Sequence, residues 1–407
     1  MIEYPLVTVI EGKTKIHVPD VESFKKSPAS YPPSDAPVFY NKVMELNRDF
    51  ALAALRVYQK KYASREQLHY CEPMAGSGIR SVRVANEIEN IAVIINDRNP
   101  QAVELINENV KQLQLEKKTQ VYTDDANELM LRFGAVGKKF DILDIDPFGS
   151  PSAYIDSAAQ VVSDNSLLAV TSTDMATMCG VYSKACIRKY ASKPIHTWIS
   201  HELTVRMLLG FIATAIARHG KMIRPVFAHS TEHYIRVYVI VEKGITKASM
   251  EKLGFISHCR NCYSIDYSFG LINTLTRECP HCKEKRQIGG PFWLENIYEK
   301  AFVDELVLEL QQLEDLYGKQ RQMSKILALI TEELKAADSQ KASICYYDLH
   351  QISDKLNSPS PALDATIQEL IKKGYIATRT HFRTNSIKTD ASIDEIIKAM
   401  KKVLKKK

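Results

Sequence analysis

The feature that most constrains the fold is a regular alternation of short apolar runs and longer amphipathic stretches between residues 68 and 171. The apolar runs predict strands, and the stretches between them carry apolar residues at helical spacing. Strands that alternate with helices imply a parallel sheet covered on both faces. The expected strands are 68–71, 91–95, a short one at 120–121, 140–145 and 167–171, and the expected helices are 78–88, 100–113 and 154–162. The chain is therefore predicted to contain an α/β domain.

The flanking segments complete this first domain. Further helices are expected at 41–62 and 202–218, and a strand at 234–242 closes the sheet, so the domain spans residues 1–245. The first residues of this domain are expected to be irregular, and the proline-rich stretch 27–37 is predicted to form neither a helix nor a central strand.

Residues 246–407 differ in character and are predicted to form a second, α+β domain. It begins with a cysteine-containing segment at 259–282, which the Gly289-Gly290-Pro291 break follows. Helices are expected at 302–316 and 323–336, and the order helix 347–356, helix 362–372, strand 375–381 predicts a winged-helix module.

Composition limits the classes of protein to consider. A chain of 407 residues is long enough for two domains, and its 45% hydrophobic and 25% charged residues are typical of a globular protein. Because no apolar run is long enough to cross a membrane and the first residues do not resemble an export signal, a cytoplasmic location is expected. The net charge of +6 suits a polyanionic partner. Much of the excess lies in a C-terminal lysine tail, which is either a contact to that partner or a frayed end: Lys398, Lys401, Lys402, Lys405, Lys406 and Lys407.

A glycine-containing turn after the first strand indicates a nucleoside site. Gly76 and Gly78 allow a tight turn whose backbone N–H groups approach a ligand at a helix N-terminus, although Ser81 occupies the third glycine position of the dinucleotide fingerprint. Asp97 follows the next strand, about 20 residues later, where an acid binds ribose hydroxyls. In an alternative interpretation, Asp97 only caps the helix that begins near Pro100.

NAD and S-adenosylmethionine both fit such a site. Asp124 or Asp125, after the third strand, could accept a hydrogen bond from an adenine amino group, or could only cap the following helix. The choice between the cofactors therefore depends on a further motif.

That motif is Asp146-Pro147-Phe148-Gly149, at the end of the strand 140–145, which hydride transfer would not need. An exocyclic base amine is a poor nucleophile, because its lone pair is delocalised into the ring, and it must be oriented and relieved of a proton. Asp146 can accept one N–H and the Pro147 carbonyl another, while Phe148 stacks on the base. Taken alone the tetrapeptide could be a plain turn, but its position at a strand end downstream of a nucleoside site favours a function.

Together these motifs resemble the tRNA guanine-26 N2-dimethyltransferases of archaea and eukaryotes. The resemblance covers most of residues 1 to 245, in order. The matching stretches are Pro37-Val38-Phe39-Tyr40-Asn41, Asn47-Arg48-Asp49, Gly78-Ile79-Arg80, Asp124-Asp125-Ala126-Asn127, Asp146-Pro147-Phe148-Gly149-Ser150-Pro151 and Thr171-Ser172-Thr173-Asp174 followed by Cys179-Gly180.

The resemblance implies a class I, Rossmann-like methyltransferase fold, with S-adenosylmethionine as donor and the N2 amine of guanine 26 in tRNA as acceptor of one or two methyl groups. Carried over by position, Asp146 would act on the amine, and Phe148 and Phe39 would clamp the guanine. The cofactor contacts would be Arg48, Arg80, Asp97, Asp125 and Ala126. Without the resemblance, the sequence would predict Arg48 to be a surface arginine on a helix and Phe39 to be an ordinary residue of the hydrophobic core.

The second domain carries a four-cysteine pattern. Cys259-x2-Cys262 and Cys279-x2-Cys282 lie 16 residues apart, a spacing typical of a structural zinc site. The His281 ring could replace one thiolate. The other cysteines are expected to be buried apolar residues, except that Cys179, near a strand end, could serve a covalent mechanism as nucleophile.

The sequence leaves two other functions open. One is methylation of another amine, such as adenine N6, and the other is a non-catalytic zinc and winged-helix protein that binds nucleic acid. A tRNA partner is expected in the favoured case, and no obligate protein partner is evident. The sequence does not determine whether one or two methyl groups are added, whether a second guanine is also modified, or what the oligomeric state is.

Overall fold

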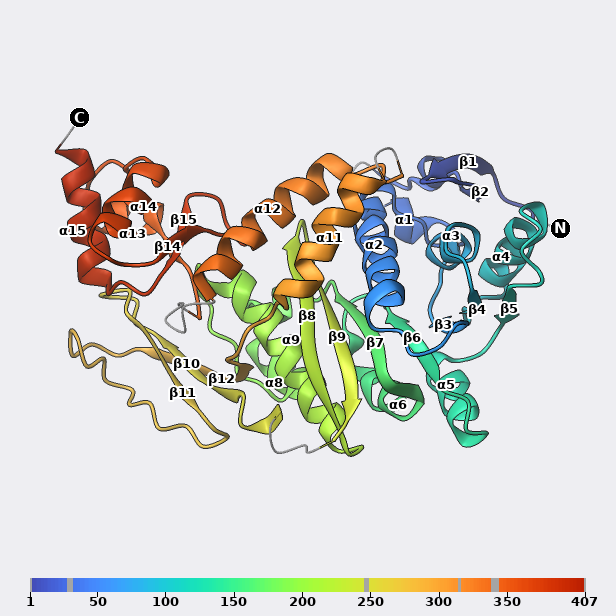
Figure 1. Cartoon of the computed structure of the whole chain (residues 1–407), viewed down its shortest axis with the longest axis horizontal. Helices are drawn as coiled ribbons and strands as arrows, with labels where there is room; N and C mark the ends of the chain where they lie inside the picture. Colours follow the sequence, from blue (N-terminus) through green and yellow to red (C-terminus); the bar gives the residue numbers. More distant parts are fainter. Residues whose placement is uncertain (1, 28–31, 245–248, 314–315, 338–343, 406–407) are drawn as a thin grey trace. The chain divides into compact units, whose positions relative to one another are not determined.

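The computed structural model describes residues 2–27, 32–244, 249–313, 316–337 and 344–405 (Figure 1). The chain divides into two compact units that are interleaved along the sequence. Unit 1 is Met1–Ser172, Tyr238–Lys243 and Asp304–Lys325, and unit 2 is Thr173–Val237, Gly244–Val303 and Ile326–Lys407. This division differs from the expected boundary near residue 245, which stays a prediction.

Unit 1 is built on parallel strands, as the alternating pattern predicts. They are β3 (Leu68–Glu72), β4 (Ile91–Asn96), β5 (Thr119–Tyr122), β6 (Phe140–Ile145) and β7 (Val162–Ser172). β3 pairs in parallel with β4 and β6, β4 with β5, and β6 with β7. The sheet order is β5-β4-β3-β6-β7-β9-β8, with β9 at Tyr234–Lys243 and β8 at Lys221–Thr231. The expected α/β sheet is confirmed, and β8 is an additional edge strand whose internal Pro225 is compatible with that position.

Helices follow the strands of unit 1 at the expected places. They are α3 (Ile79–Glu87), α4 (Pro100–Gln112), α5 (Ala126–Ala135) and α6 (Ile155–Val161). The expected helix 41–62 is a 3-10 turn, Lys42–Met44, followed by α2 (Glu45–Lys61). The turn begins where the side chain of Asn41 accepts a hydrogen bond from the Val43 N–H at 2.9 Å. Most of α2 is buried, which matches its apolar periodicity.

The expectation of an irregular start is wrong. β1 (Leu6–Glu11) and β2 (Thr14–Pro19) form an antiparallel hairpin across a two-residue turn, in which Gly12 has a φ of 57°. Ile16 and Val18 bury one face of β2 against Tyr40 and Ile79. The stretch 27–37 also contains a single helical turn, α1 (Pro32–Asp35), because a proline is tolerated in the first turn of a helix.

Unit 2 begins with the helices α7 (Met175–Met178), α8 (Ser183–Tyr190) and α9 (Ser200–Ala217). A three-stranded antiparallel sheet follows, in the order β11-β10-β12. Its strands are β10 (Leu253–His258), β11 (Ile265–Phe269) and β12 (Gln287–Trp293), shown in yellow in Figure 1. Cys259 and Cys262 lie in the β10–β11 loop, and Cys279 and Cys282 lie between β11 and β12.

The C-terminal part follows α11 (Lys300–Gln312) and α12 (Gln320–Ala337). Its elements are β13 (Tyr347–Asp348), α13 (Leu349–Lys355), α14 (Leu363–Lys372), β14 (Ala377–Arg379), β15 (Ser386–Thr389) and α15 (Ile393–Leu404). The strands form an antiparallel sheet in the order β13-β15-β14. Its core includes Leu349, Leu370, Ile387 and Ile396. In the described part of the chain, no helix is both long and apolar enough to cross a membrane.

Candidate active site

The glycine turn lies between β3 and α3, and its backbone requires glycine. Gly78 has a φ of 73°, and a Cβ atom there would lie 2.5 Å from Cγ1 of Ile106. Gly76 has a φ of 54°, and its Cβ would lie 3.1 Å from the carbonyl oxygen of Phe39. Ser81, at the third position of the fingerprint, donates its hydroxyl to Glu72 at 2.5 Å. The tight glycine turn that the sequence predicts is therefore present. The N–H groups of Gly76, Ser77 and Gly78 donate to Asp97, Phe39 and Ala75, so their approach to a ligand stays a prediction.

Asp97 at the end of β4 is joined to this turn. Its Oδ2 accepts the Gly76 N–H at 2.7 Å and its Oδ1 accepts the Asn99 N–H at 2.9 Å. Burial raises the pKa of Asp97, and the two backbone bonds oppose that rise. The alternative interpretation of Asp97 as the cap of α4 is wrong, because the N-cap residue is Asn99. Two backbone bonds leave further lone pairs on the carboxylate for ribose hydroxyls.

Asn96 is a positioning residue that the sequence argument missed. Its amide is fully buried and donates to the carbonyls of Pro73 and Asp124, both at 2.9 Å, while its Oδ1 accepts the Asp124 N–H at 2.9 Å. The Asn96 side chain thus connects, by hydrogen bonds, the end of β4 with the loops that follow β3 and β5. A polar residue as the last member of an otherwise apolar strand is the signal that could have identified it.

Asp125 and Ala126 lie at the start of α5. Oδ1 of Asp125 accepts the N–H groups of Asn127 and Glu128 at 2.9 and 3.3 Å, so the capping role is observed. Asp124 instead pairs with Arg132, at 2.5 Å. Both capping bonds use one oxygen of Asp125, so capping does not occupy Oδ2. Ala126 begins the helix, where backbone N–H groups lack partners within the helix.

Asp146 follows β6 and is held by Arg80 of α3. The guanidinium group of Arg80 is almost fully buried and donates to Asp146 through NH2, to Asn47 through NH1 at 2.8 Å, and to Glu72 through Nε at 3.0 Å. Asp144 lies 3.6 Å from the same group. Arg80 is thus surrounded by carboxylates and fixes the direction of the Asp146 side chain.

The cluster around Arg80 has more carboxylates than cations, and this excess affects the pKa of Glu72. Burial raises the pKa of Glu72 to about 7; Arg80 opposes the rise, and the charges of Asp144 and Asp146 add to it. The site therefore favours a cationic neighbour, because an added positive charge would relieve the repulsion among the carboxylates.

Phe39 and Phe148 form an aromatic pair. Their ring centroids lie 4.8 Å apart at an interplanar angle of 76°, an edge-to-face arrangement. Phe148 is 68% exposed, which is unusual for so large an apolar side chain. Phe39 also connects to the glycine turn, because its carbonyl accepts the Ser77 N–H at 3.1 Å. The exposed ring next to Asp146 offers a stacking surface for a flat ligand.

Arg48 is placed differently from the other expected cofactor contacts. Its guanidinium group makes a two-point contact with Glu11 of β1, at 2.7 and 2.5 Å, and also donates to the carbonyl of Asn41 at 3.2 Å. It is buried, so the interpretation as a surface arginine is wrong. In this structure Arg48 anchors the N-terminal hairpin, and its contact with a cofactor stays a prediction.

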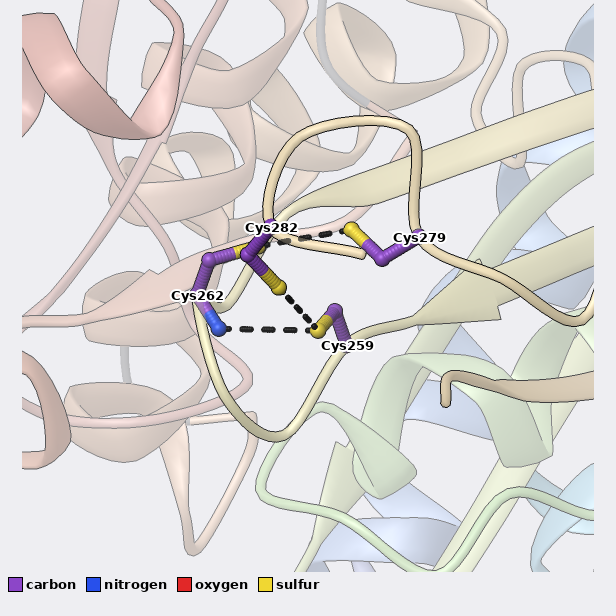
Figure 2. A group of neighbouring side chains, drawn as sticks. All are labelled: Cys259, Cys262, Cys279 and Cys282. Carbon is purple, nitrogen blue, oxygen red and sulfur yellow. Dashed lines mark hydrogen bonds between the residues drawn. The ribbon is translucent and has the colours of Figure 1, made fainter. Parts of the chain in front are cut away.

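The four cysteines of the predicted metal site converge in unit 2 (Figure 2). Their Sγ atoms all lie within 4.8 Å of one another, and two pairs lie 3.5 Å apart, Cys259 with Cys282 and Cys262 with Cys279. Four thiolates bound to one zinc ion at about 2.3 Å would lie about 3.8 Å from one another. The arrangement therefore fits a tetrahedral metal site made of four sulfurs.

The two cysteine loops have the same backbone pattern. The carbonyl of the first cysteine of each pair accepts an N–H from the residue after the second, Tyr263 at 2.8 Å and Lys283 at 2.9 Å. Both of these residues have a positive φ, 62° and 65°. Each loop thus turns its two thiols toward the same point, without a ligand from His281, whose Nε2 lies 3.9 Å from Asp266.

A covalent mechanism through Cys179 is disfavoured. Burial raises the pKa of the Cys179 thiol to about 11, whereas a nucleophilic cysteine needs a lowered pKa. Cys71, Cys186 and Cys345 are buried, as expected for small apolar side chains.

Comparison with known proteins finds relatives that match nearly the whole chain. The family model described as N2,N2-dimethylguanosine tRNA methyltransferase matches residues 12–401. The chain is 38% identical over 98% of its length to the tRNA (guanine(26)-N(2))-dimethyltransferase of Methanobrevibacter smithii, covering 99% of that protein. It is 39% identical over 96% of its length to the enzyme of the same name from Methanosarcina mazei, covering 97% of that protein.

One solved structure is similar over nearly the whole chain. It is Trm1 from Pyrococcus horikoshii in complex with S-adenosyl-L-methionine, with a TM-score of 0.82 and 29% sequence identity, covering 97% of this chain and 100% of that one. Because the family model and these relatives span both the glycine turn and the cysteine cluster, the chain belongs to the N2,N2-dimethylguanosine tRNA methyltransferase family.

Proposed function

We propose that this protein transfers methyl groups from S-adenosylmethionine to the N2 amine of guanine 26 in tRNA. The observation that carries the proposal is the geometry at the ends of β3, β4 and β6. There the glycine turn with Asp97 lies beside Asp146, which Arg80 orients, and beside the exposed Phe148. Full-length similarity to guanine-26 N2-dimethyltransferases favours guanine N2 over adenine N6, and favours an enzyme over a non-catalytic binding protein.

The residues around the glycine turn fit S-adenosylmethionine. Asp97 retains acceptor sites for the ribose hydroxyls, Oδ2 of Asp125 can accept the adenine amino group, and the Ala126 N–H can donate to a ring nitrogen. The cofactor supplies an electrophilic methyl group on a sulfonium cation. A cation suits the carboxylate-rich surroundings of Arg80.

Asp146 and its neighbours act on the amine. The Asp146 carboxylate accepts one N–H of the exocyclic amine and the Pro147 carbonyl accepts the other, which directs the lone pair toward the methyl donor. Phe148 and Phe39 hold the plane of the guanine. Asp146 then accepts the proton that the amine must lose, while the ion pair with Arg80 holds the carboxylate in place.

We also propose that the cysteine cluster holds a structural zinc ion and that the C-terminal elements form a winged helix. The proposal for zinc is supported by the converging thiols and the two matching loops. The succession α12, β13, α13, α14, β14, β15 supports the winged helix, a module common in nucleic-acid binding. Residues 246–407 would then be the tRNA-binding domain, and a cytoplasmic location stays a prediction.

The direct test is incubation of the protein with unmodified tRNA and isotopically labelled S-adenosylmethionine, followed by nucleoside mapping by mass spectrometry. Label in N2-methylated guanosine at position 26 is expected, and its mass shows whether one or two groups are added. A tRNA with adenosine at position 26 is the control. Label in N6-methyladenosine, or none with the unmodified tRNA, would contradict the proposal.

A further inference from the structure

A cavity of about 530 Å³ lies within unit 2, in a region that the proposed chemistry does not use. Its walls come from the start of α8, the segment that follows α8, the loop between β11 and β12, and β12 itself. The described residues that line it include four with basic side chains and none with a carboxylate. The basic residues are Lys193, His196, Arg277 and Arg286. A wall of this composition favours an anionic ligand.

The basic residues of the lining differ in whether a carboxylate of the protein balances their charge. Arg286 is buried, forms an ion pair with Asp266, and donates through Nε to the carbonyl of Thr276 at 2.7 Å. Its charge is therefore balanced within the protein. Lys193 and Arg277 are exposed, and within the described part of the chain neither forms an ion pair with a carboxylate.

The backbone at Lys193 is fixed by a close crossing of two chain segments. Lys193 and Gly290 exchange two backbone hydrogen bonds of 2.9 Å. A Cβ atom on Gly289 would lie 2.5 Å from the Lys193 carbonyl oxygen, and one on Gly290 would lie 2.7 Å from that of Gly254. Glycines at both positions thus let β12 approach the segment that carries Lys193. The backbone that carries the Lys193 side chain is therefore fixed at the edge of the cavity.

The backbone at Arg277 is fixed by contacts with the segment that precedes β12. Its carbonyl accepts the Arg286 N–H at 2.9 Å, and the next residue, Glu278, forms a β-bridge with Lys285. The cysteine loop begins one residue later, at Cys279. The position of Arg277 therefore depends on the same fold that brings the four thiols together.

Polar groups of the lining fit a sugar as well as a phosphate. Gln287 lines the cavity, and its Oε1 is buried without a hydrogen-bond partner among the described residues. The side-chain amide of Gln287 also carries an NH2 group, which can donate to the oxygen of a ribose hydroxyl. Asn273 adds a second amide. The volume falls within the range of about 300–1,000 Å³ that is usual for ligand sites, which is enough for a nucleotide.

We infer that this cavity binds the sugar-phosphate backbone of the tRNA substrate, with Lys193 and Arg277 on phosphate oxygens and Gln287 on a ribose hydroxyl. The inference rests on the proposed function, because that function supplies the polyanion. A ribose 2′-hydroxyl also distinguishes RNA from DNA at such a site.

The test uses the full-length double variant Lys193→Ala with Arg277→Ala. Its Kd for unmodified tRNA is measured over a series of salt concentrations by filter binding. Loss of two phosphate contacts should raise Kd by about tenfold or more and reduce the slope of log K against log salt by about 1.5. The conservative pair Lys193→Arg with Arg277→Lys should restore most of the affinity. S-adenosylmethionine binding, measured by calorimetry, should stay unchanged and so report an intact fold.

Lys111→Ala with Lys117→Ala is the matched control, because this pair of exposed lysines removes the same two charges outside the cavity. Wild-type Kd and slope in the double variant, or an equal change in the control, would overturn the inference. Loss of binding to inorganic phosphate or AMP with unchanged tRNA affinity would also overturn it, in favour of a small ligand. If the wild-type protein binds tRNA through this cavity but transfers no methyl group, the proposed function fails and the binding site stands.

Discussion

The proposed catalytic edge of unit 1, at the ends of β3 and β6, and the cavity of unit 2 have opposite charge balance. At the catalytic edge, Glu72, Asp144 and Asp146 surround one buried arginine, Arg80. In the cavity, Lys193 and Arg277 face the ligand space without any carboxylate in the lining. A substrate that is a polyanion with one reactive amine needs both environments. Its phosphates must be held by cations, while its amine needs an acceptor for protons.

Two fully buried glutamates show the same contrast inside the protein. Burial raises the pKa of Glu72 to about 7, and the opposing effects of Arg80 and the Ser81 hydroxyl do not outweigh it. Burial alone would also raise the pKa of Glu333, but Lys388 and His381 outweigh it and lower the pKa to about 2. Nζ of Lys388 lies 3.0 Å from both Glu333 and Glu202, so β15, α12 and α9 are joined by charge. The balance of neighbouring charges therefore decides what burial does to a carboxyl group.

The largest expected effect tests the acidic side of this comparison. Asp146→Ala should reduce single-turnover methylation of tRNA by about 10³-fold, because it removes the acceptor that orients the amine and takes its proton. Asp146→Asn, which keeps the shape and removes the charge, separates these two roles. Binding of S-adenosylmethionine, measured by equilibrium dialysis, should persist in both variants. Full methylation by Asp146→Ala would refute the mechanism.

A second effect tests why Gly78 must be a glycine: because a Cβ atom would have no space, or only because its φ is positive. Gly78→Ala should weaken S-adenosylmethionine binding by about tenfold or more and lower Tm, because the new Cβ meets Ile106 at 2.5 Å and must displace α4 or the turn. Gly137→Ala is the matched control, since Gly137 has nearly the same φ, 72°, and nothing within 4 Å of its Cβ position. Equal losses in the two variants would mean that the backbone angle alone matters.

A third effect concerns the cysteine cluster, which lies next to Arg277 in the basic cavity of unit 2. Cys282→Ser should abolish binding of one zinc ion per chain, measured by inductively coupled plasma mass spectrometry, and should weaken tRNA binding several-fold by releasing the segment that carries Arg277. Cys179→Ser, outside the cluster, should keep the metal. A metal-free wild-type protein with unchanged protease resistance in residues 259–282 would show that no structural zinc is required.

The smallest effect compares the two glutamates through the pH dependence of Tm. The lowered pKa of Glu333 contributes stability above pH 4.5 that is lost as the pH falls toward about 2. The raised pKa of Glu72 has the opposite sign, because stability is highest below pH 4.5 and decreases as the pH rises toward about 7. Glu333→Gln should flatten the acidic slope and Glu72→Gln the slope between pH 4.5 and 7. Identical pH profiles for both variants would contradict these assignments.

The sequence predicted the strand ends well because parallel strands buried on both faces leave an unmistakable apolar pattern. Gly76, Gly78, Asp97 and Asp146 were found because each stands directly after such a run. Asn96 was missed because its position, as a polar residue at the end of an apolar strand, does not show that it binds Pro73 and Asp124, which are distant along the chain. The N-terminal hairpin was missed because its pairing depends on tertiary contacts such as Glu11 with Arg48.

The sequence by itself determined the α/β architecture, the order of the nucleoside and amine motifs, and the four-cysteine pattern, because each depends on residues close together along the chain. Only the tertiary structure decided that Arg80 holds Asp146, that Arg48 anchors the first hairpin, and that Lys193 and Arg277 share one cavity. These pairings bring together charged residues from segments that are distant along the chain. A local sequence pattern does not indicate which of these charges will be neighbours after folding.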